Sequence, residues 1–201
     1  MNEQEIFWRG EFGNKYISRN NDKQFLNSNI KFFKKIKKYL NDSKTVFEVG
    51  CNIGLNLEAI NIILPNLKLS GIDINKKSIE ILNKKKISKN FIGSFKSFKM
   101  PRKYDLIFTK GVLIHIDPSE LEKYYKKMYN FSKKYILLVE YFNPTPVKIS
   151  YRKHNNKLFK RDFAGEMLSA FDLDLVDYGF LYKNDTKAPQ DNLSWFLLKK
   201  K

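Results

Sequence analysis

The sequence predicts an α/β fold built on one sheet of seven strands, mostly parallel, with an antiparallel strand at its C-terminal edge. From Ser43 onward, short apolar runs alternate with helical patterns, which is typical of βαβ units. A turn containing Gly50 and Gly54 joins the first apolar run to the helix after it. The last two apolar runs have no helix between them, which favours an antiparallel pair. Together these features predict a doubly wound, Rossmann-like sheet in a single domain, residues 1–201.

The expected elements follow in chain order. An apolar stripe at helical spacing predicts a helix within residues 1–42, marked by Leu26, Ile30, Phe33 and Leu40. Apolar runs predict strands at residues 45–50, 68–73, 87–93, 104–109 and 135–141. Helices are expected at residues 55–64 and 76–86. A final helix is marked by Ala164, Met167, Leu168 and Phe171, and strands at residues 173–182 and 193–198 close the chain.

One further helix has a clear start signal. Asp117 can cap it, Pro118 suits its first position, and Glu120 stands at the spacing of a capping box. We therefore expect a helix that begins at Pro118 and lies between the fourth and fifth strands in chain order.

The charge of the chain is strongly positive. Thirty-eight Lys and Arg residues face 21 Asp and Glu, which gives a formal net charge of +17, yet only five of the 38 are Arg. Lys, Asn and Ile are all encoded by AT-rich codons, so base composition accounts for much of the excess. The alternative is a polyanionic partner such as a nucleic acid, which a positive field would attract.

Other classes of protein are excluded by composition. The single cysteine, Cys51, rules out an internal disulfide framework and a CxxC zinc site, and we expect no metal. No apolar run reaches the roughly 20 residues that cross a bilayer, and the mixed, acidic start does not resemble a secretory signal. We expect a cytoplasmic protein without membrane insertion. The sequence does not indicate its oligomeric state.

The turn after the first strand carries the strongest chemical signal. A nicotinamide fingerprint needs glycine at positions 50, 52 and 55, but Asn52 and Leu55 stand there, which argues against a dehydrogenase. Gly50 and Gly54, preceded by Glu48, resemble instead the nucleoside-binding turn of class I methyltransferases. Asn52 replaces a residue that is usually glycine in that class, and Asn tolerates a left-handed backbone better than most residues.

Acidic and small residues at the next strand ends support a nucleoside site. Asp73 closes the second strand, where its carboxylate can accept hydrogen bonds from ribose hydroxyls. Ser94 and Phe95 follow the third strand, where related enzymes contact adenine. A turn former at Asp73 and ordinary loop chemistry at Ser94 are the plainer alternatives. We expect Cys51 to be a small residue beside the turn.

The segment after the fourth strand offers a candidate base. His115 could take the proton of a methyl acceptor, because a neutral imidazole accepts protons near neutral pH. It is flanked by Ile114 and Ile116, so a structural histidine at a helix entrance is an equal alternative. Asp105, at the start of the same strand, has the pattern of a structural residue.

Residues 143–163 are expected to form an insertion at the acceptor site. Asn143 opens a proline-rich loop that we interpret as rigid. Arg152 and Arg161 could hold a carboxylate or phosphate of the acceptor by bidentate contacts. Solvated charges, with Asp162 as a helix cap, are the alternative.

Nearly the whole chain resembles the small methyltransferases associated with pseudaminic acid biosynthesis. The segments that carry the resemblance are residues 7–20, 50–57, 108–116, 140–147, 158–166 and 195–198. In that family Asn52 is the expected residue. The resemblance implies a class I fold, S-adenosylmethionine (SAM) as methyl donor, and an acceptor oxygen or nitrogen on a small acidic sugar or a nucleotide-linked precursor of surface glycans.

The resemblance also extends the set of candidate site residues. It implies that residues 1–42 fold over the donor through Trp8, Tyr16 and Arg19, with Arg19 a candidate for the donor carboxylate. The full donor set is then completed by Asn56, Ile74 and Lys110. Behind His115, the candidate bases are Glu140, Tyr151 and His154. An RNA methyltransferase and a non-catalytic SAM-binding protein stay open as alternatives.

Overall fold

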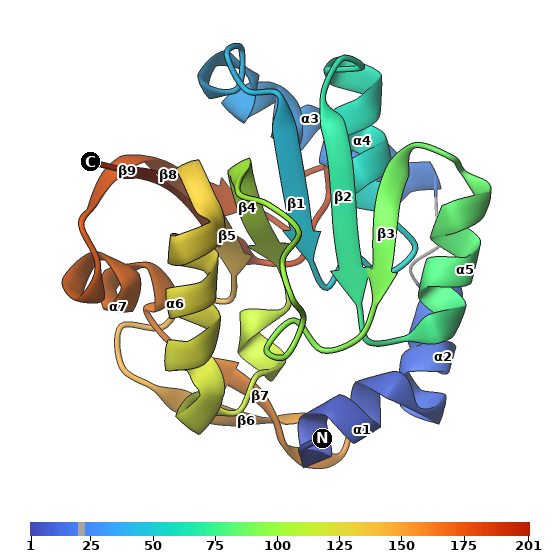
Figure 1. Ribbon diagram of the computed structural model, residues 1–201. Coiled ribbons are helices and arrows are strands. Elements are labelled where there is room, and N and C mark those ends of the chain that lie inside the picture. Colours follow the sequence, from blue (N-terminus) through green and yellow to red (C-terminus); the bar gives the residue numbers. More distant parts are fainter. Residues whose placement is uncertain (20–22) are drawn as a thin grey trace.

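The computed structural model describes residues 1–19 and 23–201, except for the side chain of Arg19. A seven-stranded sheet forms its centre, in the order β3-β2-β1-β4-β5-β9-β8 (Figure 1). The strands are β1 (Thr45–Val49), β2 (Lys68–Asp73), β3 (Ser88–Ile92), β4 (Tyr104–Lys110), β5 (Ser132–Glu140), β8 (Leu173–Leu181) and β9 (Leu193–Lys200). The first five are parallel, and β9 runs antiparallel to both β5 and β8. The predicted sheet, with its antiparallel pair at the C-terminal edge, is confirmed.

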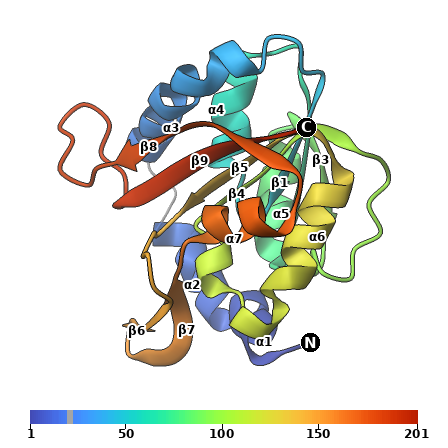
Figure 2. The same cartoon turned by 90° about the vertical axis from the view of Figure 1, so that its left-hand side faces the viewer.

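Helices cover both faces of the sheet, as a parallel sheet requires. On one face lie α3 (Lys23–Ile36), α4 (Leu55–Ile63) and α5 (Lys76–Lys84), and on the other lie α6 (Leu121–Phe131) and α7 (Phe163–Ala170) (Figures 1 and 2). Each face has its own apolar core, because side chains of β1 point alternately to the two faces: Val46 enters the core with α3 and α4, and Phe47 the core with α6. No helix in the described part of the chain is long and apolar enough to cross a membrane.

The helix predicted at Pro118 starts with a tighter turn. Residues Pro118–Glu120 form a 3₁₀ turn, η3, and α6 follows from Leu121. Asp117 caps the turn by accepting a hydrogen bond from the Ser119 N–H at 2.9 Å. The predicted capping box is absent, because the Glu120 carboxylate pairs instead with Lys96 at 2.8 Å and Lys123 at 3.1 Å.

The insertion at residues 143–163 contains a β-hairpin that sequence patterns did not predict. Strands β6 (Val147–Tyr151) and β7 (His154–Lys160) form a separate two-stranded sheet. Arg152 and Lys153 make its turn with φ of 50° and 69°. Such turns are usually recognised by Asn-Gly or Asp-Gly, so this sequence lacks the customary signal.

Two short helices, α1 (Glu3–Arg9) and α2 (Glu11–Arg19), precede α3 and lie at the end of the sheet where the parallel strands finish (Figure 1). Helix α1 is joined to the hairpin by two contacts, which we call the α1–β7 seam. Lys157 Nζ lies 2.5 Å from Glu3 Oε1, and Gln4 Nε2 donates to the Asn156 carbonyl at 3.3 Å. The N-terminal segment and the insertion therefore form one continuous cover over this end of the sheet.

Candidate active site

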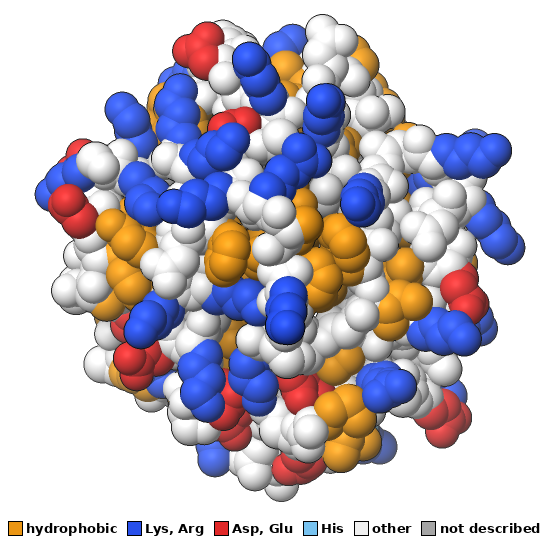
Figure 3. All heavy atoms as spheres, viewed as in Figure 1, with side chains coloured by type: hydrophobic (Ala, Val, Ile, Leu, Met, Phe, Trp, Pro, Cys, Tyr) orange, Lys and Arg blue, Asp and Glu red, His pale blue; other side chains and the backbone are white. Residues whose placement is uncertain are grey.

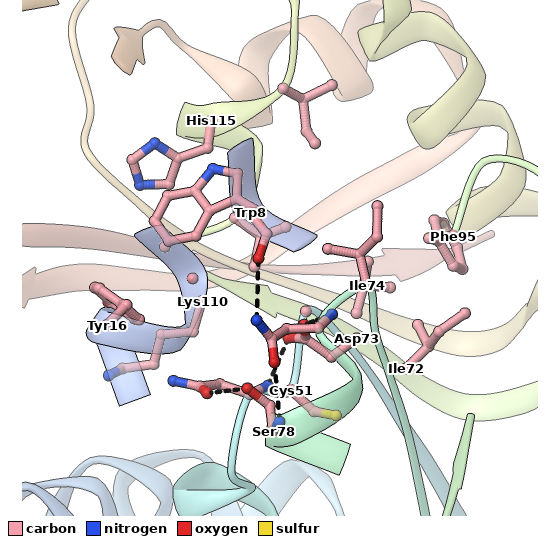
Figure 4. A pocket seen from close by; sticks show the side chains of 18 of the residues that line it. Trp8, Tyr16, Cys51, Ile72, Asp73, Ile74, Ser78, Phe95, Lys110 and His115 are labelled. Atoms are coloured by element: carbon pink, nitrogen blue, oxygen red, sulfur yellow. Dashed lines mark hydrogen bonds between the residues drawn. The ribbon is translucent and has the colours of Figure 1, made fainter. Parts of the chain in front are cut away.

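A cavity of about 230 Å³ opens at the carboxyl ends of β1, β2 and β4, beneath α1 and α2 (Figure 4). This is the position at which open α/β sheets bind ligands. The structure brings to its wall the following predicted residues: Trp8, Tyr16, Gly50, Asn52, Asn56, Asp73, Ile74, Ser94, Phe95, Lys110 and His115. Cys51 is buried beside the turn, as expected.

The turn between β1 and α4 is left-handed at three positions. The φ angles are 69° at Gly50, 47° at Asn52 and 76° at Gly54, so Asn52 adopts the conformation that its residue type tolerates. Gly54 does not line the cavity, and its role is packing: a Cβ built there would lie 2.3 Å from Leu82 Cδ1. The turn exposes backbone at the start of α4 to the cavity, which suits a ligand that must approach closely.

Asp73 ties the turn to the end of β2. Its Oδ2 accepts from the Asn52 N–H, and its Oδ1 accepts from the Asn75 N–H, each at 2.8 Å. Burial raises the pKa of Asp73, and the two backbone N–H groups oppose that shift. A carboxylate has about four acceptor positions, so Asp73 keeps capacity for hydroxyl donors from the cavity.

Glu48 and Asn56 leave two buried acceptors unsatisfied. Asn56 Nδ2 donates to Glu48 Oε1 at 2.7 Å, but Glu48 Oε2 and Asn56 Oδ1 have no partner in the described part of the chain. Glu48 is 1 % exposed, and burial raises its pKa to about 8. Asn56 lines the cavity, whereas Glu48, which was predicted to bind the donor, is not among the residues of its wall. A buried acceptor without a donor is costly, so Asn56 Oδ1 fits a ligand that carries an N–H group.

Aromatic side chains form the roof of the cavity. The Trp8 ring lies with its centre 5.3 Å from that of Tyr16 and 4.6 Å from that of His115 (Figure 4). Asn75 fastens this roof to the sheet, because its Nδ2 donates to the Trp8 carbonyl at 3.3 Å and to Asn14 Oδ1 at 3.0 Å. The predicted position of Trp8 and Tyr16 over the cavity is therefore observed, whereas the side chain of Arg19 lies outside the described part of the structure.

His115 lies at the edge of this roof, 8 % exposed. Its Nδ1 is 2.5 Å from the Lys157 carbonyl oxygen, which can only accept, so Nδ1 carries the hydrogen and Nε2 is the free acceptor. Burial lowers the pKa of His115 to about 4. The imidazole is therefore neutral at pH 7 and is held in one tautomer by the hairpin.

The other candidate bases are not on the cavity wall. The Glu140 carboxylate is buried and accepts from the N–H groups of Val112 and Leu113 at 3.1 Å and of Ile114 at 3.4 Å, so it supports the loop that carries His115. Tyr151 packs 4.9 Å from the His115 ring, outside the cavity lining. His154 is exposed on the outer side of α1, 4.9 Å from Phe7.

The predicted acceptor residues are not brought together. Asn143 Nδ2 donates to the Thr145 carbonyl at 2.6 Å within its own loop. Arg152 is exposed at the hairpin tip, and Arg161 Nε pairs with Glu166 Oε1 at 2.6 Å. The role of Arg152 and Arg161 in holding an acceptor anion stays a prediction. Asp162 caps α7, as the alternative interpretation proposed.

Several wall residues were missed by sequence reasoning. They come from the N-terminal helices and from positions next to predicted ones: Asn2, Gln4, Glu5, Gly13, Phe25, Asn29, Asn75, Ser78 and Tyr124. Asn75 had a usable signal, since Asn directly before a helix is a preferred cap, and its side chain accepts from the Ser78 N–H. Phe25 and Asn29 had none, because only the tertiary packing of α3 brings them to the cavity.

Comparison with known proteins agrees with this geometry. Residues 46–134 match the family model described as a methyltransferase domain. No curated protein sequence matches the chain.

Three similar solved structures illustrate the likeness in fold. Magnesium protoporphyrin IX methyltransferase from Synechocystis PCC 6803, with bound S-adenosylhomocysteine (SAH), is 12 % identical over 98 % of both chains, with a TM-score of 0.73. The plantazolicin methyltransferase BpumL in complex with SAH is 16 % identical over 98 % of this chain and 94 % of that one, with a TM-score of 0.66. A SAM-dependent methyltransferase from Clostridium acetobutylicum ATCC 824 is 13 % identical over 94 % and 99 %, with a TM-score of 0.66. At these identities the likeness establishes the fold.

Proposed function

From a methyltransferase domain at residues 46–134 and the fold of SAM-dependent methyltransferases, we propose that this chain transfers the methyl group of SAM to an oxygen or nitrogen of a small anionic acceptor. The matching domain and the structures that hold SAM or SAH support SAM as the donor. The observation that carries the proposal is the cavity itself, with its left-handed turn, Asp73, and the unsatisfied acceptor of Asn56 on its wall.

The lining residues fit the parts of the donor. Ile74 and Phe95 offer apolar surface for a base, and Asp73 offers acceptor positions for ribose hydroxyls. The unpaired Oδ1 of Asn56, whose amide Nδ2 is held by Glu48, suits the amino group of the donor. SAM supplies an electrophilic methyl on a sulfonium centre when bound. The protein then aligns the acceptor with the methyl group and excludes water from the cavity. The roof formed by α1 and α2 is in position to exclude that water.

His115 is the residue that we propose as the proton acceptor. It lies on the cavity wall, and the Lys157 carbonyl leaves its Nε2 free. Its neutral state at pH 7 permits it to take a proton, although the lowered pKa makes it a weak base. It is therefore suited to an acceptor whose proton is lost as the methyl bond forms.

The acceptor class rests on the resemblance to enzymes associated with pseudaminic acid. We propose a small acidic sugar or its nucleotide-linked precursor as acceptor, and the net charge of +17 favours an anion. Lys and Arg are distributed over the whole face seen in Figure 3, so the field does not mark a single track for a long polymer. RNA is the alternative acceptor, and steep salt dependence of binding would be its signature.

Calorimetry with SAM and SAH tests the donor site. We expect the wild-type chain to bind both, and Asp73→Ala to bind each about tenfold or more weakly, because the ribose loses a charged acceptor. The matched control is Asp105→Ala. Asp105 accepts two backbone N–H bonds at 2.9 Å, from Lys44 and Thr45, but at the opposite end of the sheet.

The outcomes separate cleanly. Weak binding by Asp73→Ala alone supports the assignment, and equal weakening by both variants would show that lost stability is the cause. A folded wild-type chain that binds neither SAM nor SAH would overturn the proposed function. Transfer of labelled methyl from SAM to acidic sugars, nucleotide sugars or RNA then identifies the acceptor.

A further inference from the structure

Among the residues that the structure describes, Lys110 is the one Lys or Arg in the lining of the cavity. It is the last residue of β4 and pairs in register with Val139 of β5. Its side chain extends to the side of the cavity occupied by Tyr16 (Figure 4). Ile74 and Phe95 lie on the opposite side of the cavity in the same view.

The ammonium of Lys110 has no hydrogen bond and no ion pair within the part of the chain that the structure describes. Three carboxylates face it from three elements: Glu48 of β1, Glu140 of β5, and Asp191 of the loop before β9. None of them forms an ion pair with it, and Glu140 is occupied by backbone N–H groups. Burial lowers the pKa of Lys110 to about 8. A half-buried ammonium without a direct partner is costly, and a ligand anion would relieve that cost.

We propose that Lys110 binds the carboxylate of the donor's amino-acid end, an inference that rests on the proposed function. Asn56 also lines the cavity with its Oδ1 unpaired, and its Nδ2 donates to Glu48, which interacts electrostatically with Lys110. The cavity therefore presents a cation and an acceptor, each without a hydrogen-bond partner in the described part of the chain. An α-amino acid is the ligand fragment that carries a carboxylate and an ammonium on neighbouring atoms, so Lys110 suits its carboxylate and Asn56 Oδ1 suits its ammonium.

The test compares ligands that differ only at this end of the donor. SAH has both the carboxylate and the amino group, its decarboxylated analogue retains the amino group, and 5′-methylthioadenosine has neither. Calorimetry measures each against the wild type and Lys110→Met, which keeps side-chain length and removes the charge. Lys68→Met is the matched control, because Lys68 is exposed at the start of β2, at the opposite end of the sheet.

We expect Lys110→Met to lower the affinity for SAH about 10- to 100-fold, which is the range for the loss of one charge-assisted hydrogen bond. Binding of the decarboxylated analogue and of methylthioadenosine should stay within about twofold, and Lys68→Met should leave all three unchanged. Lys110→Arg should restore part of the SAH affinity, because it restores the cation.

Two results would overturn the inference. Unchanged SAH binding by Lys110→Met would show that the donor carboxylate lies elsewhere, and would leave an acceptor carboxylate as the partner of Lys110. An equal loss of affinity for all three ligands would show that Lys110 supports the cavity but does not bind the carboxylate. In both cases wild-type binding of SAH preserves the proposed function, whereas a wild type that binds none of the ligands removes that function itself.

Discussion

Substitution of Gly54 and of Gly111 by alanine distinguishes two causes of lost stability, steric crowding and backbone strain. Both glycines have positive φ, 76° and 67°, but their surroundings differ. A Cβ at Gly54 would lie 2.3 Å from Leu82 Cδ1, and Leu82 is fully buried. A Cβ at Gly111 would have no atom within 4 Å. Gly111→Ala therefore measures strain alone, and Gly54→Ala measures strain together with overpacking.

The expected losses follow from these two contributions. A left-handed backbone costs a residue with a Cβ about 1–2 kcal/mol, and overpacking a filled core adds about 1–3 kcal/mol. We expect Gly111→Ala to lower the free energy of unfolding by about 1–2 kcal/mol and Gly54→Ala by about 2–5 kcal/mol. Urea unfolding followed by tryptophan fluorescence measures both losses. The slope of the free energy of unfolding against urea concentration should be the same in the variants and the wild type, because the same surface is then exposed on unfolding.

A double variant tests the assigned cause. Leu82→Ala removes the atoms that the new Cβ meets, so Gly54→Ala combined with Leu82→Ala should cost less than the sum of the two single losses. Equal losses for the two glycine variants, or strict additivity of Gly54→Ala with Leu82→Ala, would refute the reasoning. The first result would mean that the Leu82 side chain moves aside without cost.

Two further predictions concern buried charged groups. Glu140→Gln should lower the free energy of unfolding by about 2–3 kcal/mol at pH 8. The wild-type carboxylate accepts from backbone N–H groups at both oxygens, and in the variant one of those oxygens is replaced by an amide N–H group that cannot accept. Unchanged unfolding together with lost methyl transfer would assign Glu140 to the chemistry instead. The pKa values of Lys110 and Glu48 are both about 8, so both groups titrate between pH 7 and pH 9. Among Glu48, Glu140 and Asp191, Lys110 loses its proton and hence its hold on a carboxylate in this range, so SAH binding by the wild type should weaken relative to binding by Lys110→Arg. Calorimetry across that range should find Lys110→Arg less dependent on pH, and identical pH profiles for the two proteins would contradict this.

The centre of the sheet was predictable because β1, β4 and β5 are buried over most of their length and therefore stand out as apolar runs. Lys68–Asp73 and the start of Tyr104–Lys110 match the predicted bounds, and β5 begins three residues earlier than predicted, at Ser132. Ser132 and its neighbouring lysines lack the apolar pattern, and their strand conformation comes from pairing with β4. Tertiary pairing thus extends a strand beyond its sequence signal.

The donor side of the site was also largely predictable, since Gly50, Asn52 and Asp73 stand at the ends of recognisable strands. The structure of the predicted acceptor insertion was not. Its hairpin turns at Arg152 and Lys153, which carry no turn signal, and the partner of Arg161 is Glu166 on the following helix. Glu140 was placed among the candidate bases, and the structure shows its carboxylate bonded to N–H groups of a neighbouring loop, which no spacing along the chain indicates.

The α1–β7 seam has a consequence for the order in which the molecule folds. Its two contacts join residues that are far apart in sequence: Glu3 and Lys157 are separated by 154 positions, and Gln4 and Asn156 by 152. Closing so long a loop is entropically costly, and distant contacts are rewarded only after the chain between them is ordered. The βαβ units of residues 46–134 depend on closer partners, so we expect secondary structure to recover first on refolding and the roof of the cavity to assemble last. Recovery of donor binding is therefore a stricter indicator of complete refolding than recovery of helix and strand content.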